Sequence, residues 1–490
     1  MTAPRLRLIE SRLGVRTALS RMPFRYGTVT VRAAPVATLE VAIETEDGRR
    51  ATGYAADFLA YRWFDKRPQK TLVQNVADLL RAIDLAVSAY RAERAHNTAF
   101  ELWLASSSTM SIDGRAADLN DLTQGFGVSM PERAVIDALG RLLRRPVAEL
   151  VAKNALGIDL ARLDPELSGV ELKQILLNRP LDSLWVRHTV GLLDPITRAD
   201  VPEGGEVRDG LPETLEEYLR IDGLRFLKIK LCGRLAEDID RLTAIAALLS
   251  KRALPCAVTL DGNEQFQNLE AFAKLMDRLR ATPALKALVE AILFIEQPLE
   301  RSVALSPEAE PLMRRIGGET PMIIDEADGT LDSFRTAMDL GYRGVSHKNC
   351  KGVVKSLLNL ARARRRNAEL GTDRYFLSAE DLTTLPIVPL QSDLTMVAVL
   401  GIAHVERNGH HYFLGLDHLP PEEQSEALTH HSGLYISFGR KAILNIRDGA
   451  LDLRSLQVPG MGFIPRPRMA SMSAPETWLA KHASDDSLGS

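Results

Sequence analysis

Eight short apolar runs recur between residues 184 and 414, and this recurrence restricts the possible fold more than any other feature of the sequence. The runs are 184–188, 226–231, 257–260, 292–295, 322–324, 344–346, 375–377 and 411–414. They lie about 32 residues apart, the length of one strand followed by one helix, and helical patterns separate most of them. Eight strands that alternate with helices predict an α/β fold, a (β/α)8 barrel of the TIM type.

The N-terminal part of the chain has a different pattern, which predicts a separate α+β unit. Residues 28–32 and 37–44 carry β-branched side chains with partial alternation, as strands do. Residues 46–48 read Glu-Asp-Gly, which is a hairpin turn signal, and helical patterns follow. We therefore expect an N-terminal α+β domain at 1–165 and a barrel domain at 180–440.

Composition and charge exclude several classes of protein. Apolar residues make up 45% of the chain, too many for a disordered protein. The 61 basic and 64 acidic residues give a net charge of −3, so we expect no nucleic-acid-binding surface. The three cysteines cannot form a disulfide framework, and no apolar run is long enough to span a membrane. The start of the chain has Arg and Glu where a signal peptide needs an apolar core, so we expect a cytoplasmic protein.

Three carboxylates follow three consecutive runs. Asp261, Glu296 and Asp325 end the third, fourth and fifth predicted strands, and residues at such ends face the active-site mouth of a barrel. Adjacent strands lie about 4.8 Å apart, so the three charges repel unless a cation neutralises them. Oxygen ligands suit a hard divalent cation such as Mg²⁺. The alternative is three unrelated carboxylates held in salt bridges.

Three lysines accompany these carboxylates. Lys228 and Lys230 are two residues apart on the second predicted strand, so both side chains leave the same face. Their repulsion favours the neutral amine of one of them and lowers its pKa. Lys348 ends the sixth strand and would face them across the barrel. Lys348 and one of the other two lysines could be acid/base groups on opposite sides of a metal-bound substrate, or the lysines could pair with the carboxylates in a stabilising ion network.

Several other residues have two interpretations each. Glu380 follows the seventh run and could contact substrate or Lys348, or form a structural salt bridge. His188 could line the mouth or be a satisfied buried histidine. The pair His410-His411 suggests a metal tract but is interpreted as part of a loop. The aromatic residues within 54–63 could form a lid over the substrate or pack between domains.

These groups together define a reaction. A metal held by three carboxylates can bind a substrate carboxylate and stabilise the enediolate that forms when the neighbouring carbon loses its proton. One lysine takes the proton, and a second lysine opposite can return a proton to the other face.

The order of the motifs resembles the enolase superfamily, in particular the muconate-lactonizing enzymes and dipeptide epimerases of the mandelate racemase group. The motifs are Lys228-x-Lys230, Asp261-x-Asn263, Glu296-Gln-Pro, Asp325-Glu and Lys348. Each motif alone is weak, but five in order at the spacing of barrel strands form a strong signal. The resemblance implies that Asp261, Glu296 and Asp325 bind Mg²⁺ as the cofactor and that Lys230 and Lys348 are the two acid/base residues.

The resemblance also implies supporting residues. Lys228 would tune Lys230 and contact the substrate carboxylate, and Asn263 and Glu380 are assigned to substrate binding or support. The sequence departs from the family at Lys351-Gly-Val, where Gly-Gly is usual after the sixth-strand lysine. It also lacks a clear Asp-x-Asp at the eighth strand, where dipeptide epimerases hold an ammonium group.

For the whole molecule, the resemblance implies a capping domain that closes over the barrel. Its two loops would lie near 21–27 and 53–63, and a C-terminal segment at 441–490 would return to it. The expected substrate is a small carboxylate, and family members are often homo-oligomers.

The predicted function is therefore a Mg²⁺-dependent racemase or epimerase that uses two lysines. A dehydratase or cycloisomerase on the same scaffold is the first alternative. A glycosidase that uses Glu296 and Glu380 is another, and a catalytically silent barrel used for binding is the last.

Overall fold

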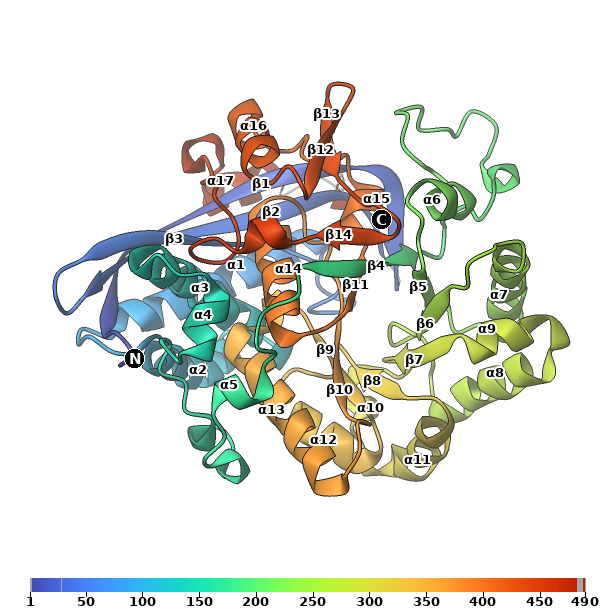
Figure 1. Cartoon of the computed structure of the whole chain (residues 1–490), viewed down its shortest axis with the longest axis horizontal. Coiled ribbons are helices and arrows are strands. Elements are labelled where there is room, and N and C mark those ends of the chain that lie inside the picture. Colours follow the sequence, from blue (N-terminus) through green and yellow to red (C-terminus); the bar gives the residue numbers. More distant parts are fainter. Residues whose placement is uncertain (1, 28, 483–487, 490) are drawn as a thin grey trace.

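The structure, a computed structural model, describes residues 2–27, 29–482 and 488–489 (Figure 1). Its N-terminal part is an antiparallel sheet in the order β1-β2-β3, covered by helices. The strands are β1 (Leu6–Tyr26), β2 (Val29–Thr45) and β3 (Arg50–Phe58), and the helices are α1 (Leu72–Ala92), α2 (Ala99–Ala116), α3 (Asp121–Leu143), α4 (Val147–Ala152) and α5 (Leu172–Ile175).

Helix α3 packs closely against β3 because Gly53 has no side chain. A Cβ atom at Gly53 would lie 2.7 Å from Cα of Ala138 and would also meet the backbone of Ala134. Backbone atoms of a packed helix cannot turn aside as a flexible side chain can, so any other residue at this position would push α3 away from the sheet.

The variant Gly53→Ala is expected to lower the free energy of unfolding by about 1–3 kcal/mol, the usual cost of overpacking a core. Urea denaturation would measure the change. Gly318→Ala is the matched control, because a Cβ there meets no atom within 4 Å and alanine favours a helix over glycine. Equal stability of Gly53→Ala and the parent would contradict the close packing.

The middle of the chain forms a closed barrel of parallel strands, which confirms the predicted fold class. The strands are β4 (Ser183–Val190), β5 (Phe226–Lys230), β6 (Ala257–Asp261), β7 (Ile292–Glu296), β8 (Met322–Ile324), β9 (Gly344–His347), β10 (Phe376–Ala379) and β11 (His404–Arg407). The helices are α6 (Leu215–Ile221), α7 (Leu235–Leu249), α8 (Leu269–Ala281), α9 (Lys286–Glu290), α10 (Arg301–Ala304), α11 (Glu310–Glu319), α12 (Ser333–Leu340), α13 (Val353–Leu370) and α14 (Val388–Leu400). Pairing of β11 with β4 closes the ring, so the carboxyl ends of all eight strands face one mouth.

The eighth barrel strand is not where the apolar run at 411–414 predicts it. The strand is β11, and His411 belongs to the short helix α15 (Gly409–Tyr412). Tyr412 is buried because its ring stacks on Phe24 of β1, with ring centroids 4.1 Å apart. The apolar run therefore marks packing against the N-terminal sheet. The interpretation of His410-His411 as part of a loop is also wrong, because both residues lie in α15.

Strand β11 reads as polar in the sequence because its buried residues are charged. Glu406 lies 2.8 Å from Nζ of Lys228, and Arg407 lies 3.3 Å from a carboxylate oxygen of Asp381. These ion pairs replace the apolar contacts that a barrel strand ordinarily makes, so hydrophobicity alone does not identify it.

The N-terminal strands are longer than the sequence predicts. Residues 29–32 and 37–44 belong to the single strand β2, while residue 28 lies outside the described residues. Irregular pairing between Leu8 and Glu10 and between Leu19 and Phe24 breaks the alternation of β1, which hides that strand in the sequence. Residues 21–26 and 53–58, expected in capping loops, lie instead in β1 and β3.

The C-terminal segment contacts both the barrel and the N-terminal sheet, beside which its elements lie in Figure 1. It contains β13 (Lys441–Leu444), β14 (Ala450–Asp452) and α17 (Pro475–His482), and it follows α16 (Pro421–His430) and β12 (Tyr435–Phe438). Strand β14 pairs antiparallel with the start of β4. Ser473 bridges to Val15 of β1, and Nε1 of Trp478 donates a hydrogen bond of 2.8 Å to Thr17.

The boundaries of the three predicted domains remain a prediction. None of the helices in the described part of the chain is long and apolar enough to cross a membrane.

Candidate active site

The predicted site residues converge at the carboxyl ends of the barrel strands. Lys230 of β5 stands opposite Asp261 of β6, and Asp261 stands opposite Glu296 of β7, in the register of the strand pairs. Asp325 directly follows β8, and Lys348 directly follows β9. All five side chains are buried. The barrel thus brings together the carboxylates and lysines that the sequence places at successive strand ends.

Lys228 lies at the centre of the charged groups. Its Nζ atom is 2.7 Å from Glu296, 3.0 Å from Asp261, and 2.8 Å from both Glu380 and Glu406. Burial alone would lower the pKa of Lys228, but the four carboxylates raise it well above its usual value. The lowered pKa expected from repulsion between lysines is therefore not found at Lys228, which is a permanent cation.

Two further lysines each pair with a predicted metal ligand. Nζ of Lys230 donates a hydrogen bond of 2.6 Å to Asp261, and Nζ of Lys348 donates one of 2.7 Å to Asp325. Burial opposes the charge on Lys348, but Asp325 raises its pKa above the usual range. The Lys348 ammonium group also lies 4.4 Å from the ring centroid of Trp63.

The pKa values of the three predicted metal ligands are shifted in different directions. Burial favours the neutral acid in each of them. Lys228 and Lys230 nevertheless lower the pKa of Asp261. In the same way, Lys348 and Lys351 lower the pKa of Asp325 well below its usual range.

Glu296 behaves in the opposite way. Burial and the charges of Asp261, Glu380 and Asp325 raise its pKa well above the usual range. Neither of its carboxylate oxygens accepts a hydrogen bond, although Oε2 lies 2.7 Å from Nζ of Lys228.

A buried carboxylate without hydrogen bonds fits a cation ligand. Asp261 and Glu296 carry hard oxygen donors at adjacent strand ends, as Mg²⁺ requires. Within the described residues, no three carboxylate or imidazole groups are already grouped as a metal site. Lysine ammonium groups lie against the carboxylates, so a cation and the lysines would compete for the same oxygens.

Two site residues were not identified from the sequence. Glu406 of β11 accepts hydrogen bonds from Lys228 at 2.8 Å and from Thr189 at 2.7 Å. Arg187 of β4 donates to Glu380 at 2.5 Å inside the barrel. Glu406 would have been found if the eighth strand had been placed at 404–407, and Arg187 stands out only as a charge inside an apolar run.

The remaining predicted residues support this network. Glu380 accepts hydrogen bonds from Arg187 and Lys228, and Asn263 donates its backbone N–H to Asp261 at 2.8 Å. His188 is buried, with its Nδ1 atom 3.2 Å from Nε2 of His410. Burial lowers the pKa of both histidines, so both are neutral.

A small cavity of about 30 Å³ lies beside the two lysines. Lys230, Lys348 and Asn263 line its barrel side, and Phe24 and Trp63 are among the aromatic residues that line its capping side. Phe58 also lines this cavity, whereas the backbone N–H of Tyr54 bonds to Asp137 of α3. Only part of the aromatic run therefore caps the cavity.

Comparisons with known proteins agree with this architecture. No family model matches the sequence, and no curated protein matches it. An enolase from Bradyrhizobium complexed with magnesium and mandelic acid superposes with a TM-score of 0.56 at 16% identity, covering 94% of this chain and 96% of that one. A dipeptide epimerase from Enterococcus faecalis has a TM-score of 0.58 at 13% identity, covering 94% and 99%. The fold is that of the mandelate racemase and muconate lactonizing enzymes.

The muconate lactonizing enzyme from Pseudomonas putida is similar over 97% of this chain and 99% of its own, with a TM-score of 0.55 at 16% identity. These likenesses confirm, as a fold, the resemblance to the enolase superfamily that the motif order predicts. They span the capping sheet, the barrel and most of the C-terminal segment.

Proposed function

We propose that the protein is a Mg²⁺-dependent enzyme of the enolase superfamily that removes the proton α to a substrate carboxylate. The observation that carries the proposal is the buried carboxylate of Glu296, which accepts no hydrogen bond and lies between Asp261 and Asp325 below a cavity lined by Lys230 and Lys348. The similar structures support it, because two of them hold magnesium with mandelic acid or with a dipeptide.

Asp261, Glu296 and Asp325 would hold the metal. Bound there, Mg²⁺ would neutralise the negative charge that develops on the substrate carboxylate. Lys230 and Lys348 now share oxygens of Asp261 and Asp325. When these carboxylates bind a metal instead of the lysines, a lysine in its neutral form can act as a general base.

The position of the two lysines favours racemisation or epimerisation. Lys230 and Lys348 end the second and sixth strands of an eight-stranded ring, so they approach the cavity from opposite sides. One lysine can take the proton from one face of the α-carbon while the other delivers a proton to the opposite face. The aromatic side chains above them exclude water from the exchange.

The expectation that the protein forms a homo-oligomer remains a prediction.

Chelator-treated protein is expected to unfold at a higher temperature when millimolar Mg²⁺ is added. A ligand at about 100 times its dissociation constant stabilises a native protein by about 2.7 kcal/mol. The stabilisation should be larger at about pH 8 than at about pH 6, because Glu296 must lose its proton to bind a metal and its pKa is raised. Differential scanning calorimetry would measure both effects.

Asp261→Asn and Glu296→Gln should each lose the Mg²⁺ effect. The matched control is Glu290→Gln, which changes an exposed glutamate next to the start of β7 and should keep it. An equal Mg²⁺ effect in the parent and in Glu296→Gln would refute the metal site.

A further inference from the structure

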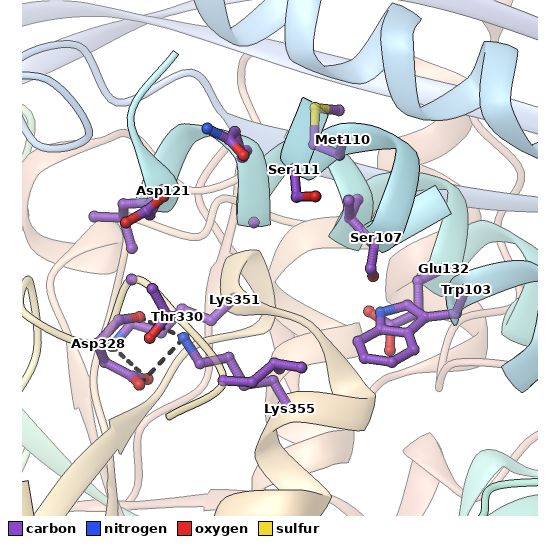
Figure 2. Close-up of a pocket in the computed structure, with 16 residues that line it drawn as sticks. Trp103, Ser107, Met110, Ser111, Asp121, Glu132, Asp328, Thr330, Lys351 and Lys355 are labelled. Carbon is purple, nitrogen blue, oxygen red and sulfur yellow. Dashed lines mark hydrogen bonds and ion pairs between the residues drawn. The ribbon is translucent and has the colours of Figure 1, made fainter. Parts of the chain in front are cut away.

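A second cavity, of about 240 Å³, lies between the capping domain and the barrel (Figure 2). Helices α2 and α3 form one wall, and the segment after β8 and the start of α13 form the other. It shares no lining residue with the cavity above Lys230 and Lys348. Its size is slightly below the roughly 300 Å³ at which pockets for drug-sized ligands begin, so it suits a small molecule.

Much of the cavity wall is apolar. Trp103 and Met110 of α2 and Leu122 and Val128 of α3 all line it. Gly125 of α3 also lines the cavity, and a Cβ atom at this position would meet nothing within 4 Å. This side of the cavity can therefore hold an aromatic ring or a short aliphatic chain.

The unsatisfied polar atoms of the cavity are acceptors. Glu132 of α3 is 3% exposed, and its Oε1 atom accepts a hydrogen bond of 2.7 Å from the backbone N–H of Val354. Its Oε2 atom has no partner. Neither carboxylate oxygen of Asp328 accepts a hydrogen bond, although ion pairs join this residue to Lys355 at 3.1 Å and Lys351 at 3.5 Å.

The ammonium groups of Lys351 and Lys355 donate their hydrogen bonds to acceptors other than the carboxylates of Glu132 and Asp328. Nζ of Lys351 donates to the carbonyl of Asp325 at 2.8 Å and to Ser346 at 2.7 Å, and Nζ of Lys355 donates to the carbonyl of Asp328. Figure 2 shows Glu132 beside Trp103 on one side of the cavity and Asp328 on the other. The buried side-chain atoms of the lining that make no hydrogen bond are all acceptors, which favours a cationic occupant over an anionic one.

We propose that this cavity binds a small primary amine, whose apolar part packs against Trp103 and Met110 and whose ammonium group donates to Glu132. Burial raises the pKa of Glu132 to about 7 despite the hydrogen bond from Val354, so an ammonium ion supplies the positive charge that this carboxylate lacks. A primary ammonium has three donors and can satisfy Oε2 of Glu132 while Asp328 adds negative potential. This site is separate from the proposed reaction and does not depend on it.

Isothermal titration calorimetry of the full chain with 2-phenylethylamine tests the proposal. We expect saturable binding with one site per chain, and at least tenfold weaker binding of 2-phenylethanol and of 3-phenylpropionate, which share the ring but lack the positive charge. Glu132→Gln should weaken amine binding at least tenfold, because it removes the charge but keeps an oxygen to accept the Val354 N–H.

Two more variants locate the site. Gly125→Leu should abolish amine binding by filling the cavity, and it tests the location even if Glu132→Gln does not fold. Lys286→Ala should leave amine binding unchanged, because this exposed lysine lies in α9 and does not line the cavity. The proposal is overturned if the parent shows no saturable amine binding, if the alcohol or the carboxylate binds as tightly, or if Gly125→Leu binds like the parent.

Discussion

Lys230→Ala and Lys348→Ala are each expected to lower turnover of the substrate carboxylate by about 10²- to 10⁴-fold, the usual contribution of a general acid or base. Both side chains line the small cavity at the barrel mouth, from opposite sides of the barrel. If each lysine serves one face of the α-carbon, each variant still exchanges the α-proton of one enantiomer with solvent. Proton NMR in D₂O, started separately from each enantiomer, would measure this exchange.

The neighbours suggest the first carboxylates to screen, which are mandelate and dipeptides. Lys286→Ala is the matched control, because this lysine lies at the exposed start of α9. Loss of exchange from the same enantiomer in both variants would contradict opposed bases and favour elimination or cycloisomerisation. Normal turnover in either variant would refute the assignment of that lysine.

Lys228→Met is expected to lower the free energy of unfolding at neutral pH by about 3–5 kcal/mol, the cost of removing one partner from a buried ion pair. The substitution leaves Asp261, Glu296, Glu380 and Glu406 close together without their shared cation. Urea denaturation monitored by circular dichroism would measure the loss, and Lys286→Met is the control for the change of residue type.

The stability difference between Lys228→Met and the parent should shrink as the pH falls. In the parent, Lys228 and Lys230 hold the pKa of Glu406 and Asp261 below their usual values despite burial, so the parent loses stability only below about pH 5, where the unfolded chain begins to bind protons at these groups. In the variant, the uncompensated carboxylates have raised pKa values, so protonation stabilises its folded state. A constant difference from about pH 7 to about pH 5 would show that the four carboxylates do not depend on Lys228.

Much of the site could be predicted because barrel strands place their last residues at one mouth. The two-residue spacing of Lys228 and Lys230 puts both on one face, and both do project among the carboxylates. The same reasoning assigns Asp261, Glu296 and Asp325 to neighbouring positions, and the strand register agrees for the first two. These inferences rest on local geometry, which short sequence patterns contain.

Long-range pairing could not be predicted in the same way. Sequence spacing gives the face that a side chain leaves, but not the partner that it meets across a closed ring. From the family resemblance, Lys228 is predicted to contact the substrate carboxylate, although four protein carboxylates surround it. Glu406 was not predicted for a related reason. Ion pairs inside the barrel allow a barrel strand to carry charged residues, whereas a hydrophobic run is the usual sign of such a strand.

The pairing of β1 with residues near the other end of the chain has a consequence for synthesis on the ribosome. β1 is an edge strand of its sheet, and Val15 pairs with Ser473 while Arg16 binds Glu423. At about 5–20 residues per second, roughly 20–90 s pass between the appearance of β1 and that of its last partners. During this time the edge is open to pairing with other nascent chains, and charged residues such as Glu10 and Arg12 oppose such pairing. Rapid translation and chaperone cover should therefore raise the yield of folded protein.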